Sequence, residues 1–158
     1  MTIEIICVGS LKETYLKEGI EEYKKGLSAL HRVQITELRE ARVADEDDGT
    51  AVLRALQSEG EKILSLLDRD AYKVARCVEG VQYDSPALAS LLEKGGAKSG
   101  KLQLVIGSSH GLCDEVKRAC DLKLSISKLT FPHQLMRFML MEILYRCASI
   151  TAGKRYHK

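Results

Sequence analysis

The sequence predicts an α/β fold with a parallel-type sheet and helices on both faces, in a single domain over residues 1–158. Short apolar segments alternate along the chain with amphipathic segments of helical length. The run from Leu102 to Ile106 is almost continuously apolar, which is typical of a parallel strand buried on both faces. The length of 158 residues, 45% of them hydrophobic, fits one folded domain.

The first predicted elements are two strands separated by a helix. Apolar residues dominate positions 2–8, which predicts a strand that ends at Gly9. Leu, Ile and Tyr then recur at three- and four-residue spacing over positions 16–30, which indicates an amphipathic helix. Apolar and polar residues alternate over positions 33–37, which predicts the second strand.

A loop, a helix and a third strand are expected next. Acidic residues are dense over positions 40–50, which favours a loop. Helical periodicity returns over positions 53–67, with Gly60 as a weak point within it. We expect the third strand near positions 72–78.

The following helix has a start signal and a stop signal. Ser85 and Pro86 have the form of an N-cap followed by proline at the first helical position. We expect this helix to end before Gly95 and Gly96. Positions 95–99 are interpreted as a loop, because the first glycine of a phosphate-binding G-x-x-x-x-G-K-[ST] motif is missing.

After the buried strand, the sequence predicts a helix, a strand and a long final helix. The short helix spans positions 114–119, and the strand lies near positions 122–126. Thr130 can cap the final helix, with Pro132 near its first turn, and the helix is expected to continue to about Thr151.

The final helix is apolar over more than one stripe. A single contact with the sheet would leave part of that surface in water. We therefore expect a homodimer in which this helix contacts a second copy, and packing of the helix inside its own chain is the alternative. The apolar residues are Leu135, Met136, Phe138, Met139, Leu140, Met141, Ile143, Leu144 and Tyr145.

The composition excludes several classes of protein. The five cysteines show no C-x-x-C spacing and the four histidines form no i, i+4 pair, so neither a disulfide framework nor a metal site is expected. No apolar run approaches the roughly 18 residues of a membrane span, and the first ten residues lack the basic start of a signal peptide. A cytoplasmic protein without a membrane partner is therefore expected.

Positive charge is concentrated toward the C-terminal end. Positions 128–158 contain six Lys or Arg against one acid, Glu142, whereas the other positions together carry a net negative charge. This distribution is typical of a surface that binds a polyanion. A solvated helix face followed by a basic tail would give the same counts.

One short motif suggests a hydrolase. Positions 107–111 match G-x-S-x-G between a buried strand and a helix, the context in which a nucleophile elbow exposes its serine, here Ser109. The helix that follows is short for such an enzyme, and no H-G-G-G-type oxyanion segment exists. The simpler interpretation is that Gly107 lets the backbone approach a ligand closely.

The segment S-I-S-K-L-T-F-P-H-Q at positions 125–134, with Tyr-His-Lys at positions 156–158, resembles the RlmH family of SPOUT methyltransferases. The resemblance extends over nearly the whole chain. It implies a fold with a C-terminal trefoil knot, a homodimer, and an S-adenosylmethionine-dependent transfer of a methyl group to N3 of a pseudouridine in 23S ribosomal RNA of the assembled ribosome. A non-catalytic ribosome-binding module with the same fold is a further alternative.

The resemblance also implies a cofactor site. Two positions depart from the family pattern: Arg76 stands where an apolar residue such as Leu is usual, and Ser108 replaces the second glycine of a common Gly-Gly pair. The cofactor residues that the resemblance implies are Arg76, Gly107, Ile126, Ser127, Lys128, Leu129, Thr130 and Phe131.

Residues for proton transfer and RNA binding lie toward the C-terminal end. The acceptor N3 must lose a proton, and Glu142 or His157 is suited to take it. Pairing of Glu142 with Arg146 at i, i+4 is the alternative. Tyr156 is expected to stack on an exposed RNA base. Phosphate contacts are expected for four basic residues: Arg137, Lys154, Arg155 and Lys158.

Overall fold

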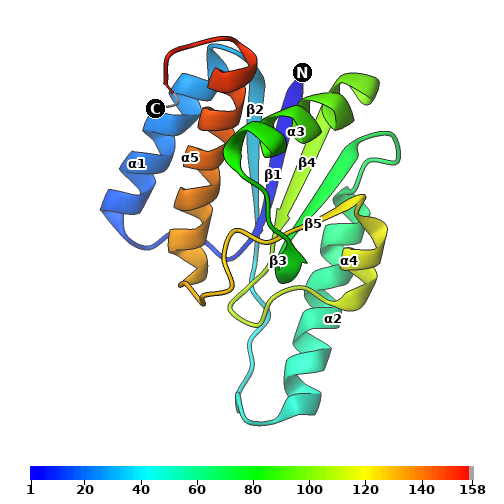
Figure 1. Ribbon diagram of the computed structural model, residues 1–158. Helices are drawn as coiled ribbons and strands as arrows, with labels where there is room; N and C mark the ends of the chain where they lie inside the picture. Colours follow the sequence, from blue (N-terminus) through cyan, green and yellow to red (C-terminus); the bar gives the residue numbers. More distant parts are fainter. Residues whose placement is uncertain (157–158) are drawn as a thin grey trace.

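The computed structural model describes residues 1–156, and in them one five-stranded sheet is accompanied by five helices (Figure 1). Each predicted strand and helix is present. The elements are β1 (Thr2–Val8), α1 (Thr14–Ser28), β2 (Arg32–Leu38), α2 (Gly49–Leu66), β3 (Tyr72–Val81), α3 (Ser85–Ser99), β4 (Lys101–Ile106), α4 (Asp114–Ala119), β5 (Leu122–Leu124) and α5 (His133–Thr151).

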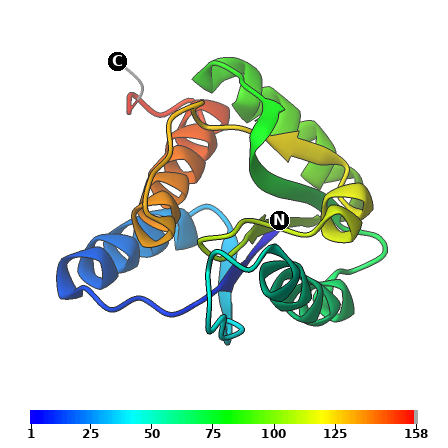
Figure 2. The same ribbon diagram turned by 90° about the horizontal axis from the view of Figure 1, so that it is seen from below.

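The sheet has the order β2-β1-β4-β3-β5, and all four neighbouring pairs are parallel. Helices α1, α3 and α5 cover one face, whereas α2 and α4 cover the other (Figure 2). Strand β4 is central and almost fully buried, as its apolar run predicts. The α/β prediction with helices on both faces is confirmed, and the trefoil knot stays a prediction.

The predicted ends of α3 are wrong in two respects. Its N-cap is Asp84 rather than Ser85, because the Asp84 carboxylate accepts a hydrogen bond from the Ala87 N–H at 2.8 Å. The helix continues through Gly95 and Gly96 instead of stopping before them. A Cβ on Gly95 would lie 2.4 Å from the ring of Tyr72, so this glycine permits close packing of α3 on the sheet.

The start of α5 also differs from the prediction, whereas α2 is one continuous helix, as predicted. Pro132, and not Thr130, is the N-cap of α5, and its side chain makes no capping hydrogen bond. Helix α2 passes through Gly60 without a break. A Cβ there would lie 2.3 Å from Cys113 Sγ, so this glycine permits close packing of α2 against the residue before α4. In both α2 and α3 the glycine is therefore required for packing rather than for a turn.

Helix α5 packs between α1 and α3 on the same face of the sheet. Gly19 and Gly26 of α1 leave room for the rings of Phe138 and Tyr145, since a Cβ at either glycine would lie within 2.6 Å of the ring opposite. Contacts within the chain thus account for the width of the apolar surface. That width does not by itself indicate a subunit interface, and the homodimer stays a prediction.

The described residues contain neither a candidate membrane span nor a candidate metal cluster. No helix within residues 1–156 is long and apolar enough to cross a membrane. In the same part of the chain, no cluster of three or more His, Cys, Asp or Glu side chains has a geometry that could hold a metal ion.

Candidate functional site

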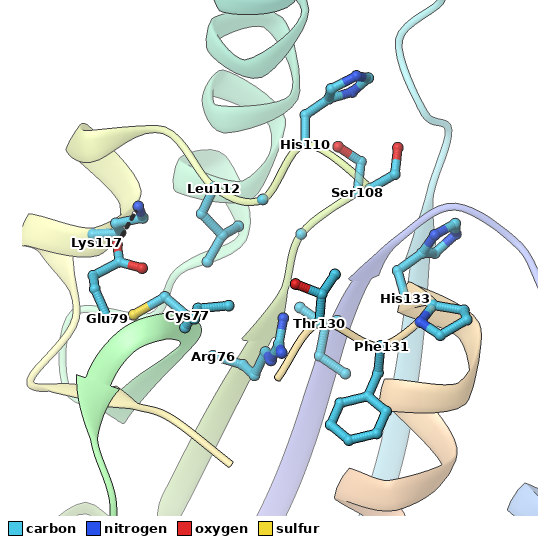
Figure 3. Close-up of a pocket in the computed structure, with 16 residues that line it drawn as sticks. Arg76, Cys77, Glu79, Ser108, His110, Leu112, Lys117, Thr130, Phe131 and His133 are labelled. Atoms are coloured by element: carbon cyan, nitrogen blue, oxygen red, sulfur yellow. Dashed lines mark hydrogen bonds and ion pairs between the residues drawn. The ribbon is translucent and has the colours of Figure 1, made fainter. Parts of the chain in front are cut away.

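A cavity of about 560 Å³ opens beyond the carboxyl ends of β3 and β4 (Figure 3). The volume lies in the range of about 300–1,000 Å³ that is typical of ligand sites, and this edge of a parallel sheet is where ligands of α/β proteins bind. Three segments form its walls: the second half of β3 from Arg76 to Glu79, the loop of residues 107–112, and the entry to α5 from Thr130 to His133. Lys117 of α4 completes the lining.

The structure brings together half of the cofactor residues expected from the resemblance. Arg76, Gly107, Thr130 and Phe131 line the cavity from three separate segments. Ile126 instead packs against the core between the sheet and α1, α3 and α5. The other expected residues, which also do not line the cavity, are Ser127, Lys128 and Leu129.

Hydrogen bonds within the segment before α5 shape it from inside. The Ser127 hydroxyl accepts the N–H of Leu129 at 3.0 Å, and the Ser125 hydroxyl donates to the Ser127 carbonyl at 3.2 Å. The side chain of Leu129 is 67% exposed. Because these two serines satisfy the segment's own backbone, they support the turn that brings Thr130 to the cavity wall.

Gly107 allows the backbone of the cavity loop to fold back on itself. A Cβ at this position would lie 2.1 Å from the Gly111 carbonyl oxygen and 2.5 Å from its carbon. Backbone atoms cannot move aside as a flexible side chain can. Only glycine therefore fits here, and the wall next to it consists of peptide groups.

A buried carboxylate, that of Glu59, is hydrogen-bonded to the loop of residues 107–112 on the side away from the cavity. Glu59 of α2 is 3% exposed, and its oxygens accept hydrogen bonds from the Ser108 hydroxyl and the Ala41 N–H, both at 3.0 Å. Burial raises the pKa of Glu59 above its ordinary value, and the two hydrogen bonds offset this only in part. Glu59 thus joins the loop after β2 to the loop after β4.

The raised pKa of Glu59 predicts a pH-dependent stability. The folded chain retains a proton on Glu59 at a pH where the unfolded chain has lost it, so this contribution is full below the unfolded pKa of about 4.3 and is lost as the pH rises through the folded pKa. In Glu59→Gln the amide oxygen can still accept the Ala41 N–H, and the amide NH2 can donate to the Ser108 hydroxyl oxygen, so both contacts persist without a charge. We expect its melting temperature, relative to the wild type, to rise between pH 4 and pH 8.

Thermal melts at several pH values check this expectation. Glu61→Gln, at an exposed carboxylate two residues further along α2, is the matched control and should follow the wild type. A difference between Glu59→Gln and the wild type that stays constant from pH 4 to pH 8 would contradict the buried-carboxylate account.

Charged groups line one side of the cavity. Lys117 forms an ion pair with Glu79, and this hydrogen bond lowers the pKa of the Glu79 carboxyl. Arg76 projects into the cavity between Cys77 and Thr130 (Figure 3). Burial lowers the pKa of the Arg76 guanidinium, and its Nε is buried without a hydrogen-bond partner.

Glu142 lies away from the cavity on the same helix that borders it. It is nine residues after His133, which corresponds to about 14 Å along α5. The Glu142 carboxylate accepts hydrogen bonds from Arg146 Nε at 3.0 Å and Nη2 at 2.6 Å, as the i, i+4 alternative predicts. Its role as a proton acceptor stays a prediction.

The tail residues lie near the far end of α5. The Tyr156 ring packs edge-on against Tyr145 at 4.7 Å between centroids, with the Arg146 guanidinium 5.1 Å from its centroid. Lys154 and Arg155 are exposed. The predictions for His157 and Lys158 lie outside the described residues, and RNA contacts by the tail stay untested.

Arg137 occupies a different environment from the one expected for a phosphate contact. Its side chain is 2% exposed, forms an ion pair with Glu37 of β2, and donates from Nη2 to the Gly9 carbonyl at 2.7 Å. Its Nε is buried without a partner, and no part of this guanidinium is exposed enough to contact an RNA phosphate. The structure therefore corrects that expectation, because Arg137 joins α5 to the ends of β1 and β2.

Sequence reasoning missed several residues of the site. Glu59 looks like one charge among many on an amphipathic helix, although its place on the same face as Ala55 and Ile63 was a signal of burial. His133 belongs to the segment at positions 125–134 that carries the resemblance but was not among the expected cofactor residues, and the Glu79–Lys117 pair had no motif to identify it. Ser109 donates to Glu40 at 3.4 Å, and no histidine within residues 1–156 is hydrogen-bonded to it, so the triad of a hydrolase is not formed there.

Comparison with known proteins extends over the whole chain. A family model described as "Predicted SPOUT methyltransferase" matches residues 1–157. The chain is 45% identical over 159 aligned positions to the ribosomal RNA large subunit methyltransferase H of Clostridium novyi, with 100% of each protein covered. It is 42% identical over 156 residues to the protein of the same name from Caldicellulosiruptor saccharolyticus, with 99% of each covered.

The comparison also includes a solved structure. The SpoU methyltransferase AviRb from Streptomyces viridochromogenes, in complex with AdoMet, gives a TM-score of 0.46 at 14% identity, and the match covers 97% of this chain and 61% of that one. The family model and the two sequence relatives each extend over nearly the full length of the chain. The protein therefore belongs to the SPOUT methyltransferase family.

Proposed function

We propose that this protein is an S-adenosylmethionine-dependent methyltransferase that acts on N3 of a pseudouridine in 23S ribosomal RNA of the assembled ribosome. Two relatives at 42% and 45% identity carry the name ribosomal RNA large subunit methyltransferase H. The observation that carries the proposal is the cavity at the carboxyl ends of β3 and β4, closed by the segment before α5. Ribosomes are its partner in this proposal, and the cytoplasm is its location.

The residues of the cavity fit this cofactor. S-adenosylmethionine has a neutral adenosine part, which backbone groups can recognise, and a methionyl part with a carboxylate. Gly107 exposes peptide groups on one wall, Thr130 and Phe131 supply a hydroxyl and an apolar face, and Arg76 supplies a cation without a partner. When bound, the cofactor supplies an electrophilic methyl group on a sulfonium sulfur.

The protein contributes mainly by positioning. Alignment of the acceptor nitrogen with the methyl carbon and sulfur lowers the barrier by as much as about 7–11 kcal/mol in favourable cases. The acceptor N3 becomes nucleophilic only after it loses its proton, and Glu142 or His157 is the base in this proposal. Lys154, Arg155 and Lys158 then contact phosphates, and Tyr156 stacks on an exposed base.

A homodimer forms part of the proposal. Glu142 lies about 14 Å along α5 from the cavity of its own chain. A second copy that packs with its own α5 reversed would place Glu142 and the tail of one chain near the cavity of the other. Mixing a tail-truncated protein with a cofactor-site variant tests this arrangement: recovery of activity supports a shared site, and no recovery contradicts it.

Nucleoside mass spectrometry tests the activity. Purified protein, labelled S-adenosylmethionine and assembled ribosomes are expected to yield methylated pseudouridine, whereas free 23S RNA is expected to yield much less. Label in another nucleoside, or none with any substrate, would refute the assignment. Ribosome binding without methyl transfer would indicate a non-catalytic module, and labelling of Ser109 by a serine-reactive phosphonate would indicate a hydrolase.

A further inference from the structure

Arg76 is a cation without a partner inside the cavity. Among residues 1–156 its side chain forms no hydrogen bond and no ion pair, and its Nε is buried. It sits where β3 pairs with β5, in register with Leu124, so the strand places the start of its side chain at the cavity wall. The close-up shows the side chain directed into the cavity between Cys77 and Thr130 (Figure 3).

The acids and bases around the cavity leave Arg76 unpaired. Glu79, three residues further along β3, is engaged by Lys117. Glu59 is behind the loop and is engaged by Ser108 and the backbone of Ala41. Arg76 is half-buried and borders the cavity, and its guanidinium has no anion among the described residues, which leaves it available to pair with the anion of a ligand.

The chemistry of that ligand follows from its surroundings. We propose that Arg76 is a specificity-determining residue of the cofactor cavity, and that its guanidinium binds the carboxylate of the cofactor's methionyl group. The inference rests on the cofactor assignment made above. S-adenosylmethionine has a single carboxylate. An Arg–carboxylate pair can form two parallel N–H···O bonds, and such a pair would set the direction of the methionyl chain.

The same pairing resolves a conflict of charges. A guanidinium and a sulfonium in one cavity repel each other, and the repulsion decreases when a carboxylate lies against the guanidinium. An RNA phosphate is a second anion that an arginine can bind, but Arg76 lies within the cavity wall and its Nε is buried, which favours the smaller ligand.

Calorimetry with two matched ligands tests the proposal. S-adenosylhomocysteine has the carboxylate, and its decarboxylated form lacks only that group. Arg76→Leu is expected to weaken binding of S-adenosylhomocysteine by about tenfold to hundredfold, the loss of one charge-assisted pair, and to leave the decarboxylated ligand within about twofold of the wild type. Arg76→Lys, which retains the charge, is expected to recover most of the affinity.

Other results would overturn the proposal. Equal or tighter binding of S-adenosylhomocysteine by Arg76→Leu would show that the guanidinium does not bind the carboxylate. Equal loss of both ligands, or a lower melting temperature that accounts for the loss, would assign Arg76 to support of the cavity wall. Unchanged affinity for S-adenosylhomocysteine with weaker, less salt-dependent ribosome binding would assign it to a phosphate.

Calorimetry with the wild type distinguishes failure of the cofactor assignment from failure of the role of Arg76. If the wild type binds neither ligand, the cofactor assignment fails and the role of Arg76 fails with it. If the wild type discriminates between the ligands and Arg76→Leu discriminates equally well, only the role of Arg76 fails.

Discussion

Replacement of Gly107 by alanine is expected to weaken cofactor binding by about a hundredfold or more. The new methyl group would lie 2.1 Å from the Gly111 carbonyl oxygen, so the loop of residues 107–111 must open. A misplacement of about 1 Å can cost on the order of a hundredfold in the rate of a positioned reaction, and we expect a loss of similar size in affinity when the cavity wall itself is displaced. Titration calorimetry with S-adenosylhomocysteine measures the loss directly.

A matched substitution separates this effect from a general one. A Cβ on Gly49 meets no atom within 4 Å, and this residue opens α2 far from the cavity loop. Gly49→Ala is therefore expected to bind like the wild type and to be as stable or slightly more so. If Gly107→Ala kept wild-type affinity with an intact fold, the cavity loop would not be part of the cofactor site.

Replacement of Arg137 by methionine is expected to lower the free energy of unfolding by about 2–4 kcal/mol. The substitution removes the ion pair with Glu37 and leaves the buried Gly9 carbonyl without its 2.7 Å donor. The range is reduced because the Glu37 side chain is 42% exposed and solvent screens its charge. Urea unfolding measures the change, and thermal melts should shift down by roughly 5–15 °C.

Two further variants make this result specific. Arg137→Lys keeps the charge but not the fork geometry, and we expect about half of the loss. Glu37→Gln combined with Arg137→Met should be less destabilising than the sum of the single changes, because the two side chains interact directly. If Arg137→Met unfolded like the wild type and only ribosome binding decreased, the original phosphate assignment would be correct after all.

The regular elements follow from local patterns, and the sequence predicts them well. Strand β4 is apolar on both faces because helices cover both, so its character is visible without any partner. The ends of α3 were harder, since Gly95 and Gly96 usually signal a stop. They continue the helix here because it packs close to Tyr72 and Met1, which lie far away in sequence.

The part of the site that depends on local sequence was predicted, and the part that depends on distant contacts was not. Gly107 and the segment before α5 stand out by their composition and by the resemblance, and Gly107, Thr130 and Phe131 line the cavity. Burial of Arg137 and Glu59 depends on partners that are 128 and 49 residues away in the chain, Gly9 and Ser108. A charge pattern cannot reveal such partners, so a charged residue on an exposed helix face and a buried charged residue look alike in the sequence.

The position of Tyr156 sets a limit on what a single chain can do. Helix α5 is 19 residues long, about 28 Å, and the cavity borders its first residue while the tail leaves from its last. Tyr156 is five residues beyond Thr151, and five fully extended residues span at most about 18 Å. The tether is therefore too short for Tyr156 to reach the opening beside which its own helix begins. In the proposed homodimer, a base stacked on Tyr156 would therefore meet the cofactor bound by the neighbouring copy, because within one chain this ring lies beside Tyr145, twelve residues along α5 from His133.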